Sequence, residues 1–479
     1  MKRDLPGCLL RTSDKPAVRD DHGGITYRDL ARWARAVAAR IESLNLPPGA
    51  RVGLLLPNSR GAVAAAAGAA LSGRCLFPLN IHLTKAEMDA LADRANVGVI
   101  VCNEVNPPDI ACGDVPLLRI SEILEDFETP APIPCTSPDP DADFVCLGTS
   151  GSTGTPRIAV RTLRAMEANL NQVSMALDIA PADRFLSVVP FWHANGFSNC
   201  LLLPLANEAE ILAMERFLPR QTLDAILDYR PTVVVGSPFI YGCLLRVLDP
   251  AVQLGFVRIW LSSGAPLPED VRCGLRRLGI VVRQLYGSTE TGTISISSGD
   301  PEHEMSGCVG RPVPGVRVRV VGEDGGILKP GEEGEIEVAT PAMFRGYMTD
   351  GGEVEVPTSG GFRRMGDRGR IDTRGRLHLS GRSDGTINVG GLKVDPEEVR
   401  RVLHSIPQVR DAVVFGDRRS DGMQTVRAVV VADAGIDRRH ILETCRRSLA
   451  EYKLPRQITF ADEIPKDTMG KVPLNLLRK

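Results

Sequence analysis

The chain has 479 residues, 43% hydrophobic and 24% charged, so it can bury a large core divided over at least two domains. Its formal net charge of −2 provides neither a basic field for nucleic acid nor a polybasic run for an anionic membrane. The first residues lack the apolar centre of a secretory signal, and no apolar run is long enough for a membrane span, so a cytoplasmic protein is expected. The eleven cysteines form no CxxC pair, which favours reduced, buried thiols.

Helical and strand-like patterns alternate from residue 25 to about residue 80, and the alternation resumes with the short apolar strands that begin at Val233, Phe256 and Val281. This alternation predicts a layered α/β domain with a largely parallel sheet. The Ala-rich run at 61–73 is expected to be a packed helix. The Pro-rich and acidic stretch at 106–143 is expected to be an irregular connection.

The pattern changes near Gly310, where VRVRVV and GEIEVA alternate with period two and Gly/Pro turns separate them. A β-rich portion is therefore expected after the α/β core. Beyond Asp384 follow an apparent helix (VDPEEVRRVLHSI), two apolar strands and a helix from about Arg438 to Ala450. The fold class predicted is α/β, with a large N-terminal domain and a small α+β C-terminal domain.

A loop rich in Gly, Ser and Thr, TSGSTGTPR from Thr149 to Arg157, directly follows the apolar strand DFVCL. Glycine permits left-handed backbone, so successive N–H groups can converge on an anion, and the loop hydroxyls add further donors. The loop ends in no GK[ST] and contains no GxGxxG. Taken alone, the pattern fits either a triphosphate cradle or an ordinary linker.

The loop resembles the signature of the adenylate-forming superfamily, which contains acyl-coenzyme A synthetases and peptide-synthetase adenylation domains. Seven further landmarks occur in the family's order: FWHANG at Phe191, SSGAPL at Ser262, YGSTE at Tyr286, MGD at Met365, GRSD at Gly381, GGLKVDPEEV at Gly390 and PKDTMGK at Pro465. The resemblance implies an AMP-binding and substrate domain over residues 1–383 and a mobile lid domain with a catalytic lysine over 384–479. It also implies that a carboxylic acid reacts with ATP to form an acyl-AMP, which then passes to a thiol.

Four residues receive chemical roles by this resemblance. Glu290 looks like the ligand of Mg²⁺, and Thr289 like the donor to the α-phosphate. Lys471 looks like the compact cation that stabilises charge during adenylation, in a chain where only nine of the 57 basic residues are Lys. His193 falls beside the expected position of the substrate carboxylate.

The nucleotide and coenzyme A contacts follow from the same motifs. Asp367, assisted by Arg382, resembles the ribose-binding carboxylate, and Tyr286 the face on which adenine stacks. The full set of expected contacts comprises Thr149, Ser150, Gly151, Ser152, Thr153, Gly154, Arg157, Gly264, Ala265, Pro266, Tyr286, Asp367, Arg382 and Lys393.

The expected acid pocket surrounds the FWHANG motif. Trp192 occupies the position at which amino-acid-activating members carry an Asp, so an α-amino acid substrate is not expected, and Asn195 could bond a polar substituent. Small residues are expected to form the remaining wall: Ser237, Ser262, Ser263, Gly287 and Ser288.

The thiol acceptor is inferred from the C-terminal motifs. Asp384 resembles the family's hinge, and the GGLKVDPEEV form favours coenzyme A over the phosphopantetheine of a carrier protein, which remains an alternative. A second alternative is a nucleotide-binding module without catalysis. Three positions depart from the family pattern: Arg157 and Asn388 replace Lys, and Met365 replaces Thr.

Overall fold

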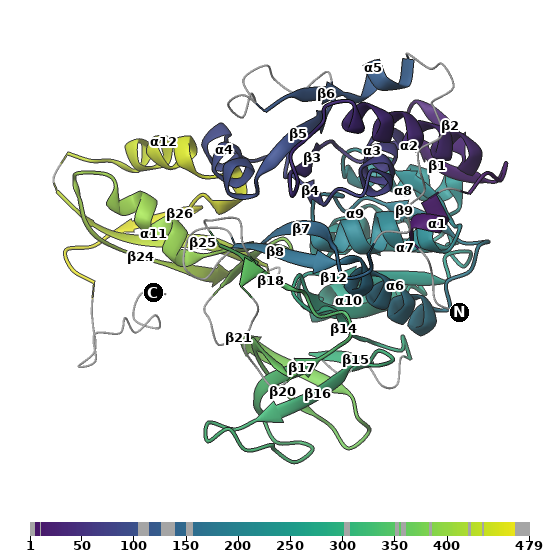
Figure 1. Ribbon diagram of the computed structural model, residues 1–479. Coiled ribbons are helices and arrows are strands. Elements are labelled where there is room, and N and C mark those ends of the chain that lie inside the picture. The colour runs from purple at the N-terminus through teal and green to yellow at the C-terminus, as the bar shows by residue number, and fades with distance from the viewer. Residues whose placement is uncertain are drawn as a thin grey trace.

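The computed structural model describes residues 5–9, 11–103, 115–125, 139–149, 157–300, 307–349, 354–355, 361–382, 386–419, 423–433 and 435–464. Two large sheets with helices packed around them form the bulk of the chain, with a β-rich lobe below and a smaller C-terminal unit to one side (Figure 1). Among the described residues, no helix combines the length and apolarity needed to cross a lipid bilayer.

The larger sheet has 13 strands in the described part of the chain. In spatial order they are β16 (Arg317–Val321), β17 (Gly334–Ala339), β20 (Arg363–Ile371), β21 (Leu377–Arg382), β15 (Cys308–Pro312), β14 (Gly292–Ile296), β13 (Val282–Ser288), β12 (Ile259–Ser263), β11 (Val233–Gly236), β9 (Arg184–Ser187), β10 (Glu210–Ala213), β1 (Pro16–Asp20) and β2 (Gly23–Thr26). The run from β1 through β10, β9, β11 and β12 to β13 is parallel, as expected. From β14 onward the pairing is antiparallel.

The second sheet has eight strands among the described residues. In spatial order they are β19 (Val354–Glu355), β18 (Gly346–Met348), β8 (Arg157–Thr162), β7 (Asp143–Thr149), β4 (Leu76–Pro78), β3 (Arg51–Leu55), β5 (Val97–Cys102) and β6 (Leu117–Arg119). The expectation of an irregular connection over residues 106–143 is wrong for residues 115–125, which the structure describes. There, β6 pairs with β5 and α5 (Ile120–Glu125) follows, because Leu118 and Ile120 are buried in the main core.

Two helices link the sheets. Helix α2 (Tyr27–Glu42) begins at a capping box formed by Thr26 and Asp29, and α3 (Arg60–Leu71) confirms the packed Ala-rich helix. Helix α3 contacts β1 of one sheet and β3 and β4 of the other. A Cβ on Gly68 would lie 2.5 Å from the Cβ of Val37, so glycine is what permits the close approach of α2 and α3.

The other helices before residue 300 flank these sheets. They are α1 (Leu5–Leu9), α4 (Lys85–Arg94), α6 (Leu163–Leu177), the π-helix η2 (Gly196–Leu202), α7 (Leu203–Ala206), α8 (Pro219–Tyr229), α9 (Pro238–Val247) and α10 (Glu269–Arg277).

The C-terminal unit has its own hydrophobic core, which includes Val399, Val430 and Ile441. Its elements are β22 (Ile387–Val389), β23 (Leu392–Val394), α11 (Pro396–His404), β24 (Val409–Arg418), β25 (Gln424–Ala432), α12 (Arg438–Ser448), the 3₁₀ turn η4 (Glu451–Lys453) and β26 (Gln457–Phe460). The mixture of helices and strands confirms the α+β expectation. The unit lies against α4 of the N-terminal part (Figure 1).

Candidate active site

The predicted pocket residues lie at the carboxyl ends of three neighbouring parallel strands. Gly236 of β11 is opposite Ser262 of β12, and Ser263 is opposite Leu285 of β13. The residues that continue these strands, among them Ser237 and Gly287, are therefore brought to one edge of the sheet. In an open α/β sheet this edge is where ligands bind.

The small side chains at this edge have different local roles. The hydroxyl of Ser237 accepts a hydrogen bond from the Ile240 N–H and caps α9. The hydroxyl of Ser262 is buried and has no hydrogen-bond partner among the described residues. A Cβ on Gly287 would lie 2.3 Å from the carbonyl oxygen of Gly292, so no larger residue fits there.

The turn after β13 holds the YGSTE motif. The Ser288 hydroxyl accepts hydrogen bonds from the backbone N–H groups of Glu290 and Thr291, each at 3.2 Å. The turn is therefore shaped by Ser288, one of the residues expected to line the pocket wall. Thr289 lies between these residues and is partly exposed.

Tyr286 and Asp367 lie together in the wall of the site. The phenol of Tyr286 donates a hydrogen bond of 2.6 Å to the Asp367 carboxylate, and both residues are buried. Asp367 pairs with Arg382 across β20 and β21, so the backbone of Arg382 is adjacent, although its side chain is outside the described part. The ribose-binding role that the motifs assign to Asp367 and Arg382 stays a prediction.

Glu290 is held ionised in a cationic environment. Burial opposes its ionisation, but Lys393, hydrogen bonds from Tyr347 and Ser288, and Arg363 outweigh this effect and lower its pKa. The Tyr347 phenol donates to Glu290 Oε1 at 2.6 Å. A carboxylate that stays charged is what a magnesium ligand requires.

Two residues of this environment, Tyr347 and Arg363, were missed by motif reasoning. Arg363 donates a hydrogen bond of 2.8 Å to the Tyr347 phenol oxygen, and its guanidinium lies 4.8 Å from the Phe344 ring centroid. The guanidinium of Arg157 lies 5.1 Å from the Tyr347 ring centroid. The GYM and GFRRMGD segments carried no sequence signal that would have linked them to Glu290.

His193 lies beside the hairpin formed by β22 and β23. Burial and the charge of Lys393 lower the pKa of His193 to about 4. A hydrogen bond to the backbone of Gly391 favours the protonated ring but is outweighed. The N–H of Asn195 donates to His193 Nδ1 at 3.2 Å. His193 is therefore neutral near pH 7, with Nδ1 as an acceptor.

Trp192 and Asn195 complete this side of the site. The Trp192 ring meets His82 and His193 edge to face, with centroid distances of 6.1 and 6.3 Å. The Asn195 side-chain oxygen accepts a hydrogen bond of 2.8 Å from Asn199. Behind Trp192 is a small apolar hollow lined by Leu54, Leu56, Ala62, Ala66, Pro78, Phe191, Phe197 and Leu201.

The C-terminal hairpin is bonded directly to the loop after β12. Asn388 Nδ2 donates to the carbonyl oxygen of Gly264 at 2.5 Å, and Asn388 Oδ1 accepts from the Gly391 N–H at 2.8 Å. A Cβ on Gly264, whose φ is +93°, would lie 3.4 Å from Gly391 Cα. Ala265 is partly exposed and Pro266 exposed on this same loop.

Several predicted residues cannot be placed. The predicted phosphate-loop residues, the hinge and the catalytic lysine lie outside the described residues: Ser150, Gly151, Ser152, Thr153, Gly154, Asp384 and Lys471. The side chains of Thr149 and Arg382 also lie outside the described part.

Comparison with known proteins agrees with this geometry. A feruloyl-CoA synthase of Amycolatopsis sp is 31% identical over 95% of this chain and 94% of its own length. An indoleacetate–CoA ligase of Aromatoleum aromaticum is 28% identical over 96% of this chain and 93% of its own. The structure of the amide bond synthetase McbA from Marinactinospora thermotolerans matches with a TM-score of 0.91 at 26% identity, covering 99% of both chains.

Residues 9–348 match the family described as AMP-binding enzyme, and residues 398–471 match the AMP-binding enzyme C-terminal domain. The two matches follow the order of the N-terminal part and the C-terminal unit. Because they cover most of the chain, this protein belongs to the AMP-binding enzymes, the adenylate-forming superfamily that its motifs resemble.

Proposed function

We propose that this chain is an AMP-forming acyl-CoA synthetase. A carboxylate oxygen of the acid attacks the α-phosphorus of ATP and pyrophosphate leaves; the thiol sulfur of coenzyme A then attacks the acyl carbon and AMP leaves. The observation that carries the proposal is the convergence of Glu290, the Tyr286–Asp367 pair and the Gly391–Lys393 hairpin on one edge of the sheet. The CoA-ligase names of the relatives support the same reaction.

The nucleotide is proposed to lie along Tyr286, Asp367 and Arg157. Asp367 would accept hydrogen bonds from the ribose hydroxyls and Tyr286 would border the adenine. Glu290 would be the protein ligand of Mg²⁺, a fit supported by its lowered pKa and by the cations that surround it. The metal would neutralise phosphate charge, with the phosphate oxygens supplying further ligands. Lys471 and Thr289 are proposed to stabilise the charge that develops during adenylation.

The arrangement of the hairpin supports the thiol-transfer step. Gly391 and Lys393 of the C-terminal unit face His193 and Glu290 of the N-terminal part. The proton of the thiol would go to water, because a ring whose pKa is lowered to about 4 is too weak a base to accept it. Rotation about Asp384 would exchange this hairpin for Lys471 between the two half-reactions.

The acid is proposed to be a small or medium carboxylic acid, aromatic acids included, without an α-ammonium group. Trp192 places an aromatic surface, and not a carboxylate, beside His193. Asn195 is bonded to Asn199, so a polar substituent would have to compete with that partner. Trp192, Asn195 and the serines expected in the wall carry no charge, which favours an uncharged acyl group.

The test is pyrophosphate release across a panel of carboxylic acids, followed by mass spectrometry of the products. Acid-dependent release with an acyl-CoA product is expected in the presence of coenzyme A. A thioester formed only on a holo-carrier protein would favour carrier loading. Absence of acid-dependent pyrophosphate release across the panel would contradict the adenylating function.

A further inference from the structure

The phenol ring of Tyr347 connects two segments that are far apart in the chain. Strand β18 pairs with β8 so that Tyr347 lies opposite Ala159, and Arg157 is two residues before Ala159. Residues two apart on a strand share a face, so the Arg157 side chain can reach over the Tyr347 ring. The observed distance of 5.1 Å from guanidinium to ring centroid agrees with this register.

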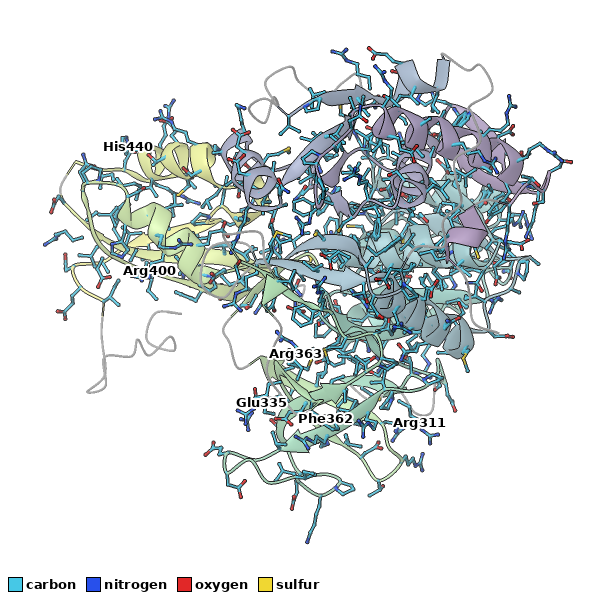
Figure 2. The ribbon with its side chains drawn as sticks, in the orientation of Figure 1. Arg311, Glu335, Phe362, Arg363, Arg400 and His440 are labelled. Atoms are coloured by element: carbon cyan, nitrogen blue, oxygen red, sulfur yellow. The ribbon has the colours of Figure 1, made fainter. Side chains whose placement is uncertain are left out.

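Arg363 approaches the same ring from the other sheet. It is the first residue of β20, and its guanidinium lies 5.4 Å from the Tyr347 centroid and 4.8 Å from the Phe344 centroid. Its hydrogen bond to the Tyr347 oxygen uses one of the five N–H donors of a guanidinium. Figure 2 shows Arg363 where the β-rich lobe joins the rest of the chain, with Phe362 and Glu335 farther into that lobe.

The next residue, Arg364, is in a different situation. Its guanidinium pairs with the carboxylates of Glu335 and Glu337 at 3.3 and 3.2 Å. The bond of Arg363 goes instead to an uncharged phenol. The two adjacent arginines thus have the same charge, but Arg364 is matched to acidic neighbours on the lobe, whereas Arg363 is turned toward Glu290 and Arg157.

Two guanidinium groups lie over the phenol ring that is bonded to Glu290. Arg157 and Arg363 share the Tyr347 ring, and Lys393 and Arg363 both act on the Glu290 carboxylate. Two guanidinium groups thus lie at the ring whose phenol is bonded to Glu290, and one of them, that of Arg157, is at the start of β8. An anion with several negative charges is the ligand that such an arrangement would bind.

We propose that Arg363 binds the polyphosphate of ATP and the pyrophosphate that leaves, opposite Arg157, with Tyr347 as the support that positions both guanidinium groups. This inference rests on the proposed function. During adenylation the bond from the α-phosphorus to the bridging oxygen breaks, and its electron pair stays on pyrophosphate. The negative charge of the leaving group therefore increases, and a forked guanidinium is suited to stabilise it.

The experiment is isothermal titration calorimetry on the full chain with three ligands: ATP and pyrophosphate, each with Mg²⁺, and AMP. The variants are R363Q and the matched control R364Q, which removes the same charge one residue away. For R363Q the affinities for ATP and pyrophosphate are expected to fall about tenfold, the typical effect of one lost charge-assisted contact. The affinity of R363Q for AMP, and all three affinities of R364Q, should equal those of the wild type.

Equal behaviour of R363Q and R364Q would overturn the inference, as would a loss of AMP affinity equal to the loss of ATP affinity. If thermal unfolding shows that R363Q does not fold, R363K replaces it, because lysine keeps the positive charge but lacks the forked guanidinium. A selective loss of ATP and pyrophosphate affinity in R363K supports the inference. An unchanged affinity overturns it. A wild-type chain that binds no ATP would instead contradict the proposed function, so the two failures are distinguishable.

Discussion

Lys453 and Glu87 form a buried ion pair across the two parts of the chain, with 2.7 Å between Nζ and Oε1 and side chains only 4% and 9% exposed. Glu398 of the C-terminal unit accepts from the same ammonium at 2.8 Å. The other oxygen of Glu87 caps α4 through Thr84. One carboxylate therefore both begins α4 and holds the C-terminal unit against it.

Lys453→Met is expected to weaken this contact. It would leave Glu87 and Glu398 as two buried carboxylates without their cation, and removing one partner of a buried ion pair costs about 3–5 kcal/mol. Because the pair is formed with the hairpin in the site, thioester formation from supplied acyl-AMP should slow more than pyrophosphate exchange. Single-turnover kinetics of the two half-reactions measure this.

Lys85→Met is the control, since Lys85 pairs with Asp89 on the exposed side of the same helix. Its effect should be within about 0.5 kcal/mol, as for most surface ion pairs. Equal slowing of both half-reactions by Lys453→Met would mean that the ion pair stabilises the fold in general and not the arrangement in which the hairpin lies in the site.

Tyr347→Phe is expected to affect adenylation through Glu290. The substitution keeps the ring beside Arg157 but removes the hydrogen bond that lowers the pKa of Glu290. The pKa should rise, so the acid limb of pyrophosphate exchange should move to higher pH, with a rate loss of about tenfold for one charged hydrogen bond. An unchanged pH profile with a lower rate at every pH would exclude an effect of Tyr347 through the pKa of Glu290.

Asn388→Ala should loosen the hairpin at the site. Its amide bridges Gly264 and Gly391, and losing two hydrogen bonds of about 1 kcal/mol each predicts a slowing of thioester formation by roughly 5- to 30-fold. Adenylation should change little. Rapid-quench measurement of acyl-CoA from supplied acyl-AMP gives the rate. Asn388→Asp keeps the acceptor for Gly391 and loses the donor to Gly264, so its slowing should be smaller than that of the Ala variant. Normal thioester formation in both would refute the bridging role.

The folded stability should depend on pH through His193. Its pKa is lowered to about 4 from 6.5, first by burial and then by Lys393. Between these values the unfolded chain binds a proton that the folded chain excludes, so the free energy of unfolding should fall as pH falls from 6.5 toward 4. His193→Gln should make this decline shallower in urea titrations, whereas replacing the exposed His22 should not. A decline as steep as in the wild type would show that other groups cause it.

Lys471→Ala is expected to abolish acid-dependent ATP–pyrophosphate exchange and to leave thiolysis of supplied acyl-AMP largely intact, because a cation is needed only where phosphate charge develops. Asp384→Pro should produce the reverse pattern, with adenylation spared and thioester formation blocked. Exchange that survives in the Lys471 variant would mean that the catalytic lysine has been misassigned.

Local sequence was sufficient for many of the helices and strands. Short apolar runs indicated β11, β12 and β13, and the motifs at the ends of these runs singled out Tyr286 and Glu290. These strand ends can be read locally because a short apolar run stops where Gly or Ser begins a turn. The same reasoning failed for β6, whose Leu118 is buried within a stretch that composition marked as irregular.

The contacts of Tyr347, Arg363 and Lys453 were decided only by the tertiary structure. Tyr347 reaches Glu290 because β18 pairs with β8 in one register, and Lys453 reaches Glu87 because the C-terminal unit packs on α4. Pairing of distant strands and packing of separate cores depend on the whole chain, and no local pattern encodes them. The sequence by itself determined which chemical groups the site contains, whereas the fold decided which distant side chains hold those groups in position.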